Sequence, residues 1–526
     1  MTISRALISV SDKSDLIDFA KSLQQLNIEI LATGGSAKQL KDHGITITDV
    51  SSYTGFPEIM DGRVKTLHPK IHGGILARRG IDDETLETHD ISPIDLVVVN
   101  LYPFQDVITK PATTLATAIE HIDIGGPTML RSAAKNHEYV TVIVDPKDYQ
   151  TVIDELKESG DTQLHTRRYL AQKTFAHTAH YDTVIANYLA QQQPNHEINS
   201  AHEPLPETFQ PHYKKTLSLR YGENPHQVAA FYQDSNHIEL NGTLGHAKTL
   251  QGKPLSYNNM IDTDAALACV QGLDPQQPGC VIVKHATPCG VAQAKTLHEA
   301  YQKALSTDAT SAFGGIIACN HTLDAPTAQA IIDQQFAEVI IAPAVTNEAI
   351  NILSIKKNLR VLCCGYLPTH YDQLNLVSIS GGLLIQSRDQ LTLDSNTCQI
   401  VTKRQPSTAE LNELYFAWRV VQFVKSNAIV YANNQMTLGI GTGQTSRVFS
   451  AEIAALKAQH AGLSLTGAVM ASDAFFPFAD SIEIAANKGI TAIIQPGGSK
   501  RDPEVIATAD KLGLAMILTG VRHFLH

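Results

Sequence analysis

The sequence predicts an α/β protein in which helices cover mainly parallel sheets and the chain is divided into two domains. Short apolar runs typical of buried strands alternate with amphipathic helical patterns on both sides of one seam. That seam, 191–212, is rich in Gln, Pro, Asn, His and Glu and has no apolar periodicity. Short motifs recur beyond the seam, which indicates an internal duplication. We therefore expect domains at 1–195 and 213–526, joined by a linker at 196–212.

The first domain has the pattern of a parallel sheet with helices between its strands. Apolar runs at 6–10, 28–31, 96–99 and 140–144 are the expected strands. Helical patterns follow the first two runs, and a long helical stretch at 164–189 ends the domain. Ligands of such sheets bind at the carboxyl ends of the strands, so polar residues that follow strands are the first candidates for a site.

The second domain is again α/β and contains two pairs of similar short motifs. Val-Lys-His-Ala at 283–286 resembles Val-Lys-Ser-Asn-Ala at 424–428. Ser-Ala-Phe at 311–313 resembles Ser-Asp-Ala-Phe at 472–475. We expect two similar subdomains with a site shared between them.

Composition restricts the class of protein and of ligand. Of 526 residues, 43% are hydrophobic and 18% charged, which is ordinary for a globular chain with sizeable cores. No window approaches the roughly 20 apolar residues that span a bilayer, and the first apolar stretch is too short for a secretory signal. We expect a cytoplasmic protein without a membrane partner. The net charge of −11 argues against a nucleic-acid partner, although a local cluster of Lys and Arg can still hold a small anion.

The cysteines give no sign of a metal site or of a disulfide framework. All seven lie beyond residue 268, their number is odd, and no pair has CxxC spacing. Mostly buried, reduced thiols are the expected state.

Residues suited to hold a phosphate follow the first two expected strands. Thr33-Gly34-Gly35-Ser36 opens a helix, whose first N–H groups are unpaired and carry partial positive charge. Glycine lets the backbone approach an anion closely. Ser9, Ser11 and Lys13 stand at the end of the first strand. The alternative is that both loops are ordinary strand–helix turns. This alternative is less favoured because two such loops occur close together in the sequence.

Three further blocks add charged and polar groups to this first candidate site. Arg63 and Lys65 are two apart, so on an extended chain they project from one face, although a solvated basic strand is the alternative. The remaining candidates in these blocks are Thr66, Asn100, Tyr102, Asp123, Gly125, Gly126 and Lys135.

The blocks ISVSDK, LATGGS, DGRVKTLHPKIHGG, NLYPF and IDIGGPTMLRSAAKN resemble, in this order, the cyclohydrolase domain of the bifunctional family of aminoimidazole carboxamide ribotide (AICAR) transformylase/inosine monophosphate (IMP) cyclohydrolase. The resemblance implies a fold similar to methylglyoxal synthase. It also implies that the formylated ribotide (FAICAR) closes to IMP here with loss of water. The ribotide and its phosphate would be held by Ser11, Lys13, Gly34, Gly35, Ser36 and Thr66. Proton transfer and stabilisation of the oxyanion would fall to Lys65, Tyr102, Asp123 and Lys135, with Arg63 and Asn100 nearby.

The second candidate site centres on Lys284 and His285, which end an apolar run at 281–283. Adjacent Lys and His at the end of such a strand indicate a site. Cys289 after a proline is like half of the zinc motif of nucleobase deaminases, but residue 292 is Ala and no HxE precedes it, so the ligand count excludes zinc. Arg220 is a candidate phosphate ligand because its guanidinium bonds phosphate in a bidentate manner, although a surface Arg in a turn is the alternative.

The blocks LRYGENPHQ, VKHATPCG, SAFGGIIA, VKSNAI, GIGTGQTSR, SDAFFPFAD, PGGS and VRHF resemble the transformylase domain of the same family. The resemblance implies a duplicated fold similar to cytidine deaminase, without zinc, and 10-formyltetrahydrofolate as the formyl donor to AICAR. His285 would shuttle the proton, Lys284 would be its charge partner, and Asn427 would donate to or orient the oxyanion. Family members form homodimers. Substrate contacts would come from Arg220, Tyr221, Ser311, Phe313, Gly314, Phe475, Asp480 and Arg522.

The sequence departs from the family pattern in two places, and it leaves two alternative functions to be considered. Thr287 stands where the family often has Asn, and the tail VRHFLH is less basic than the family pattern. One alternative keeps only the transformylase and makes the first domain a phosphate-ligand regulatory module. The presence of Lys65, Tyr102, Asp123 and Lys135 together argues against it. The other, a methylglyoxal-synthase-type lyase fused to a transferase, fits the DGRVKTLHPKIHGG block less well.

Overall fold

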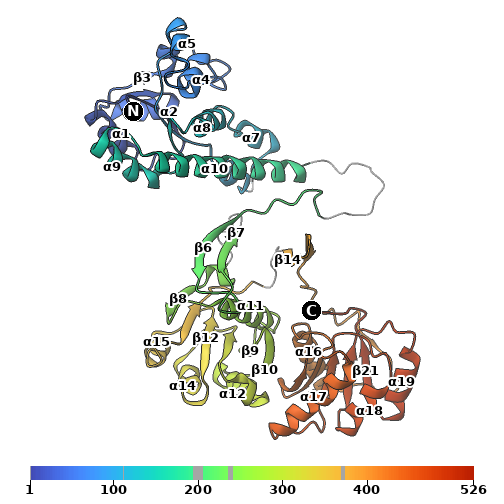
Figure 1. Cartoon of the computed structure of the whole chain (residues 1–526). Helices are drawn as coiled ribbons and strands as arrows, with labels where there is room; N and C mark the ends of the chain where they lie inside the picture. Colours follow the sequence, from blue (N-terminus) through green and yellow to red (C-terminus); the bar gives the residue numbers. More distant parts are fainter. Residues whose placement is uncertain (1, 111, 193–204, 235–240, 369–373) are drawn as a thin grey trace. The chain divides into compact units, whose positions relative to one another are not determined.

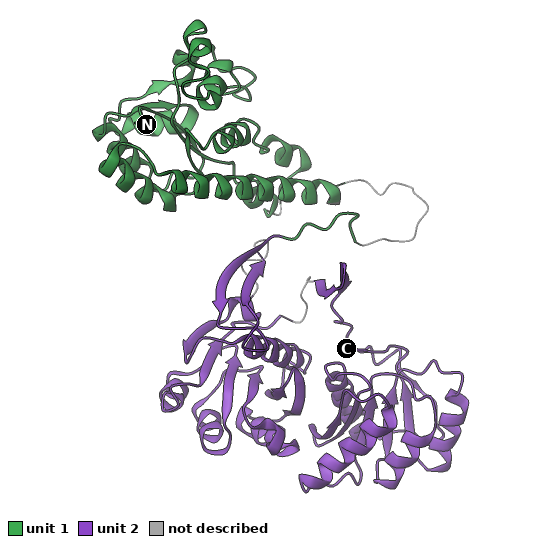
Figure 2. Ribbon diagram, viewed as in Figure 1, with its two compact units in different colours: residues 1–211 green, residues 212–526 purple. Residues whose placement is uncertain are grey.

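The chain forms two compact units, Met1–Pro211 and His212–His526 (Figure 2). The computed structural model describes residues 2–110, 112–192, 205–234, 241–368 and 374–526. Helices and strands are labelled in Figure 1. Most of the linker expected at 196–212 lies outside the described residues.

A parallel sheet forms the centre of unit 1. Within the described residues it has five strands in the order β3-β2-β1-β4-β5, and every neighbouring pair is parallel. The strands are β1 (Arg5–Val10), β2 (Glu29–Ala32), β3 (Thr48–Asp49), β4 (Leu96–Asn100) and β5 (Thr141–Ile143). Leu7, Ile8 and Val97 are fully buried, as expected for strands covered on both faces. The four strands predicted from the sequence are confirmed, and their carboxyl ends meet at one edge, called here the unit 1 edge.

Helices follow the strands of unit 1 where polar or glycine residues end the apolar runs. The helix α1 (Leu16–Gln25) buries Leu16, Phe19 and Leu23, and Phe19 stacks on Tyr149 with ring centroids 4.1 Å apart. The long helix predicted at 164–189 is α10 (Leu164–Gln191). The other helices are α2 (Gly34–Asp42), α3 (Val50–Thr54), α4 (Pro69–Leu76), α5 (Asp83–Thr88), α6 (Phe104–Ile108), α7 (Leu115–Glu120), α8 (Gly125–Lys135) and α9 (Tyr149–Ser159).

Unit 2 is built on one long mixed sheet. Over the described residues it has twelve strands in the order β16-β21-β20-β19-β17-β18-β10-β9-β11-β12-β13-β8. The first repeat contributes β8 (Lys248–Gln251), β9 (Gly279–Lys284), β10 (Thr287–Gln293), β11 (Gly315–Cys319), β12 (Ala337–Ala342) and β13 (Arg360–Cys363). The second contributes β16 (Gln399–Ile400), β17 (Ile429–Asn433), β18 (Met436–Gly441), β19 (Val469–Ser472), β20 (Ala492–Gln495) and β21 (Ala515–Leu518).

The two halves of this sheet repeat the same succession of elements, so unit 2 is an internal duplication. Read outward from the centre, β10-β9-β11-β12-β13-β8 corresponds to β18-β17-β19-β20-β21-β16. The helices of the first half are α11 (Tyr257–Gln271), α12 (Leu297–Thr307), α13 (Ala309–Ala312), α14 (Ala325–Gln334) and α15 (Asn347–Leu353). Those of the second are α16 (Thr408–Val421), α17 (Arg447–His460), α18 (Asp480–Asn487) and α19 (Asp502–Lys511). The likeness to cytidine deaminase stays a prediction.

The repeated sequence motifs that predicted the duplication do not occupy equivalent positions in the two repeats. The motif at 283–286 ends β9, whereas the motif at 424–428 precedes β17, the equivalent strand. Likewise 311–313 precedes β11, and 472–475 begins at the end of β19. Equivalent strands run in opposite directions, because β9, β10, β18 and β17 are antiparallel in succession. All four motifs therefore meet at a single edge of the sheet, called here the His285 edge.

Two short antiparallel ribbons lie outside the long sheet of unit 2: β6 (Tyr213–Leu219) with β7 (Ala229–Asp234), and β14 (Leu374–Ile379) with β15 (Gly382–Ser387). None of the helices in the described part of the chain is long and apolar enough to cross a membrane.

Candidate active sites

Two lysine ammonium groups converge on the glycine turn that opens α2. Thr33 is the N-cap residue, and Gly34 has a φ of +56°, a left-handed conformation that favours glycine. A Cβ atom on Gly34 would lie 3.3 Å from Lys65 Nζ, and one on Gly35 would lie 3.4 Å from Lys13 Nζ. Unpaired backbone N–H groups and two cations thus surround one point at the unit 1 edge, which is an arrangement suited to a phosphate.

Two side chains fix the loops of this glycine turn. The Ser36 hydroxyl accepts the N–H of Val10 and donates to its carbonyl, so it joins α2 to the end of β1. Asn100, at the end of β4, accepts the N–H groups of Ser11 and Asp12 and donates to the Asp12 carbonyl at 3.0 Å. Both side chains therefore hold the loops at this edge. Ser9, half-buried on β1, pairs with β4 beside them.

Glu58, which the sequence reasoning missed, bridges two of the expected ligand residues. Its Oε1 accepts the Thr33 hydroxyl at 2.9 Å, and its Oε2 lies 3.3 Å from Lys65 Nζ. A lone Glu in a loop between helices gives no sequence signal. Its role becomes visible only when the fold places it beside Lys65.

A second helix N-terminus, that of α8, contributes the expected acid of this site. Asp123 Oδ1 accepts the N–H of Gly126 at 2.8 Å, and a Cβ on Gly125 would lie 2.9 Å from the Thr66 hydroxyl. Burial raises the pKa of Asp123, while bonds from the N–H groups of Gly126 and Tyr102 oppose the rise. The Asp123 N–H donates to the Tyr181 hydroxyl, a support from α10 that the sequence did not indicate.

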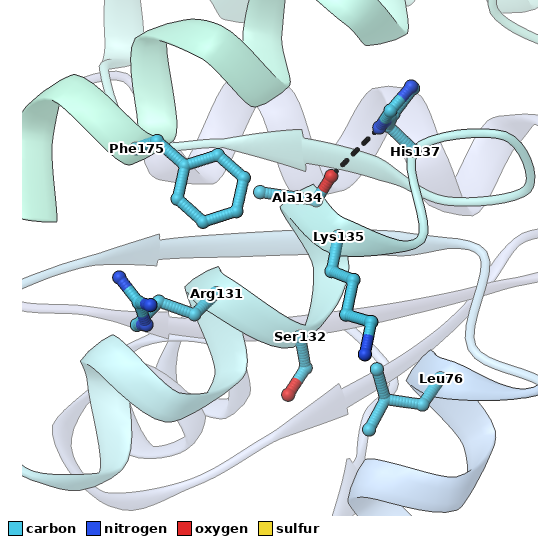
Figure 3. Close-up of a pocket in the computed structure, with 7 residues that line it drawn as sticks. All are labelled: Leu76, Arg131, Ser132, Ala134, Lys135, His137 and Phe175. Carbon is cyan, nitrogen blue, oxygen red and sulfur yellow. Dashed lines mark hydrogen bonds between the residues drawn. The ribbon is translucent and has the colours of Figure 1, made fainter.

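The structure places two other expected residues away from this group. Arg63 forms an ion pair with Glu120 at 2.9 Å, and both side chains are largely exposed. Lys135 is in the last turn of α8, ten residues beyond Gly125, so about 15 Å of helix separate it from Asp123. There it lines an open surface pocket with Arg131 and Phe175 (Figure 3). The prediction that Lys135 works beside Asp123 does not fit this placement within one chain.

In unit 2, Lys284 and His285 stand where β9 turns into β10. His285 and Ala286 have φ values of 52° and 55°, so both turn residues are left-handed, as in a type I′ hairpin. Lys284 Nζ donates to the carbonyls of Phe313 and Gly314 at 2.9 and 3.2 Å. The Ala286 N–H donates to Asp262 Oδ1 at 2.7 Å, and Asp262 is another residue that the sequence reasoning missed.

Two expected substrate contacts, Ser311 and Phe313, lie on the segment before β11. Phe313 is 66% exposed, and its ring centroid lies 5.2 Å from that of Phe336. The Ser311 hydroxyl donates to Asp308, which also pairs with Lys457 of the second repeat at 3.1 Å. This last pair joins the two repeats near the His285 edge.

Asn427 is held by a buried network from the second repeat. Its Nδ2 donates to the Gln444 carbonyl at 2.9 Å. The preceding Ser426 hydroxyl donates to Asp473, which is fully buried and pairs with Arg447 at 2.7 Å. Arg447 also donates to the carbonyl of Phe475, an expected substrate contact. The network therefore ties Asn427 and Phe475 together.

The remaining expected residues of unit 2 contact their own chain neighbours. Arg220 lies over the Tyr221 ring at 5.1 Å, and Arg522 lies over the Phe524 ring at 4.7 Å. Asp480 accepts the N–H of Ser481 in the first turn of α18. No hydrogen bond or ion pair recorded between described residues joins Arg220, Arg522 or Asp480 to Lys284 or His285.

Cys289 has the environment of an inert thiol. It is buried on β10, and burial raises its pKa to about 12. Among the residues that the structure describes, no group of His, Cys, Asp or Glu is arranged to hold a metal ion.

Comparison with known families bears on both units. The model of the AICARFT/IMPCHase bienzyme family matches residues 133–457, and the MGS-like domain model matches residues 15–128. The chain belongs to the AICARFT/IMPCHase bienzyme family. It is therefore a bifunctional enzyme of purine biosynthesis with formyltransferase and IMP cyclohydrolase activities, and its substrates are small molecules of that pathway, including a formyl-folate. The regulatory-module alternative is not favoured.

Unit 1 is thus an MGS-like domain on a parallel sheet, as predicted. One solved structure, described as the crystal structure of ForH, is 35% identical to this chain over 36% of its length and 100% of the other chain, with a TM-score of 0.33.

Proposed function

We propose that each unit carries one of the two activities. Unit 1 holds the IMP cyclohydrolase site at its sheet edge, and unit 2 holds the transformylase site at the His285 edge. The observation that supports the first assignment most directly is the convergence of Lys13 and Lys65 on the glycine turn of α2. The second rests on Lys284 and His285 at the β9 turn, on the same edge as Asn427.

For cyclisation, we propose that the ribotide phosphate sits at the start of α2 and the reacting base near Asp123. The carboxamide nitrogen attacks the formamide carbon of the same molecule, so holding the two groups together supplies much of the rate. Lys65 stabilises the developing oxyanion, and Asp123 and Tyr102 exchange protons with the reacting groups. Thr66 and the N–H group of Gly125 position the substrate, while the Gly126 N–H holds Asp123. We assign Lys135 no role in the reaction within one chain, because the length of α8 separates it from Asp123.

For formyl transfer, we propose that His285 removes the proton of the ribotide amine. That amine is conjugated with the ring and is a weak nucleophile, so proton removal is needed, and imidazole exchanges protons near neutral pH. Lys284 Nζ has three hydrogens and donates two of them to carbonyls, which leaves one for the tetrahedral oxyanion. Asn427 Nδ2 has one further hydrogen beyond its bond to Gln444 and can donate it to the same oxygen.

The finer identities in this proposal come from the family resemblance. The formyl donor is 10-formyltetrahydrofolate, the acceptor is AICAR, the protein acts in the cytoplasm, and it assembles as a homodimer. Arg220, Tyr221, Ser311, Phe313, Gly314, Phe475, Asp480 and Arg522 contact these substrates. No catalytic metal enters either step.

A split assay on the whole protein tests the proposal. One reaction receives AICAR with 10-formyltetrahydrofolate, and the other receives only FAICAR. IMP in both reactions is expected. If FAICAR accumulates in the first reaction and stays unconverted in the second, the assignment of a cyclohydrolase site to unit 1 is contradicted.

A further inference from the structure

Two carboxylates occupy equivalent positions in the two repeats of unit 2. Asp262 on α11 and Glu413 on α16 each stand six residues after the serine that caps the helix, Ser256 and Ser407 respectively. Each accepts the N–H of the second residue of a two-residue hairpin turn. Ala286 donates to Asp262 at 2.7 Å, and Gln435 donates to Glu413 at 2.9 and 3.1 Å. The duplicated fold thus contains the same helix-to-turn bond twice.

Both turns adopt a backbone conformation that needs support. His285 and Ala286 in the first repeat, and Asn434 and Gln435 in the second, have φ values between 52° and 55°. Residues other than glycine rarely adopt this left-handed conformation, and Ala286 has no polar side chain that could stabilise it locally. The carboxylate on the helix supplies the bond that holds each turn.

The two turns differ in the chemistry that they carry. The second turn holds Asn434 and Gln435, and it lies at the opposite edge of the sheet from the first. The first turn holds His285 and follows Lys284, and Asp262 interacts electrostatically with both. Cys289, buried on β10, also interacts electrostatically with Asp262. Burial raises the pKa of Asp262, whereas the N–H groups of the turn and the nearby Lys284 and His285 side chains oppose the rise.

We propose that Asp262 is a positioning residue for formyl transfer. By accepting the N–H of Ala286, its carboxylate fixes the turn that aims the His285 imidazole at the amine of the acceptor. Glu413 holds the equivalent turn without serving the reaction. The inference rests on the role proposed above for His285.

The test compares Asp262→Ala, Asp262→Asn, Glu413→Ala and His285→Ala in the full-length protein, with steady-state kinetics of formyl transfer and of ring closure. A small displacement of a catalytic group can lower the rate by about 100-fold. We therefore expect Asp262→Ala to lower kcat for formyl transfer by about that factor, with KM for AICAR within about twofold. Asp262→Asn, which keeps an acceptor oxygen, should recover about tenfold of the loss. Glu413→Ala should leave kcat unchanged.

Ring closure, which we assign to unit 1, serves as the internal control for enzyme concentration. Urea unfolding of unit 2 shows that each variant is folded and whether the loss of either turn bond costs similar stability. Equal losses of kcat in Asp262→Ala and Glu413→Ala, or a loss carried by KM alone, would overturn the positioning role. If Asp262→Ala does not fold, Asp262→Asn decides, and an unchanged kcat overturns the role. If His285→Ala keeps formyl transfer, the catalytic role proposed for His285 is contradicted, and the positioning role of Asp262 falls with it. If His285→Ala loses it while both Asp262 variants keep kcat, only the inference about Asp262 fails.

Discussion

The side-chain oxygen of Asn100 accepts the backbone N–H of Ser11 at 2.6 Å, so the end of β4 holds the loop that follows β1. The same oxygen accepts the N–H of Asp12 at 2.8 Å. The loop that carries Lys13 toward the start of α2 therefore depends on one amide from a neighbouring strand.

Asn100→Ala should weaken substrate binding in ring closure. Loss of these bonds frees the loop that carries Lys13, and hydrogen bonds of this kind contribute about 0.5–1.5 kcal/mol each. We expect KM for FAICAR to rise by about tenfold, with formyl transfer unchanged. Asn136→Ala is the control, because its amide bonds the carbonyls of Ile75 and Ala77 away from the edge. It should lower the free energy of unfolding of unit 1 without raising KM, and similar KM values in both variants would contradict the account.

Glu58→Gln should strengthen anion binding at the glycine turn of α2. The carboxylate of Glu58 pairs with Lys65 and repels a phosphate, so its neutralisation leaves Lys65 free for the ligand. Partly exposed pairs contribute up to about 1 kcal/mol, so the inhibition constant of inorganic phosphate for ring closure should fall by about twofold to fivefold, and less at high salt. Glu120→Gln removes the exposed partner of Arg63 and should have no such effect. An unchanged constant for Glu58→Gln would show that Glu58 does not compete with the anion.

Asp123 should shift the acidic limb of the ring-closure rate to higher pH than an exposed aspartate would. Burial raises the pKa of Asp123 above 3.8, so as pH falls it takes up its proton earlier than an exposed carboxyl does. If the ionised form is the base, kcat falls with decreasing pH through a midpoint above 3.8, and Asp123→Asn is slow at every pH.

Stability provides an independent check on the sign of this shift. A folded pKa above the unfolded value means that stability is lost as pH rises through the folded pKa. Asp123→Asn, which mimics the protonated acid, should therefore not lower the stability of unit 1 at pH 7 in urea unfolding. A midpoint at or below 3.8, or a marked loss of stability, would count against the assignment.

Asp473→Asn should destabilise unit 2 and remove formyl transfer. Asp473 is fully buried and pairs with Arg447, so the substitution leaves a buried cation without its counter-charge. Breaking such a pair costs about 3–5 kcal/mol of unfolding free energy. Glu504→Gln, which breaks the exposed pair with Arg501, should cost less than about 1 kcal/mol. Urea unfolding measures both, and equal losses would contradict the structural role given to the network.

The sequence was sufficient for the features that depend on local pattern. Buried strands such as β4 and the glycine turn after β2 follow from apolar runs and from the need for a left-handed residue at Gly34. Lys284 and His285 were predicted to end a strand because an apolar run stops there abruptly.

The sequence was insufficient where a role depends on which segments the fold brings together. Glu58 and Asp262 are single carboxylates whose partners, Thr33 and Ala286, lie 25 and 24 residues away along the chain. Lys135 was grouped with Asp123 because they lie in one motif, but the rise of α8 separates them. The repeated motifs predicted a duplication, yet they lie at opposite ends of equivalent strands. They meet at one edge of the sheet because equivalent strands run in opposite directions.

The central claim is that the two activities reside in two independent sites, one in each unit. The most direct measurement is the rate of both reactions in Lys65→Ala and Asp123→Ala on the one hand and Lys284→Ala and His285→Ala on the other, each shown to be folded. The first pair should lose ring closure and keep formyl transfer, and the second pair should do the reverse. Loss of both activities from any one of these folded variants would contradict two independent sites.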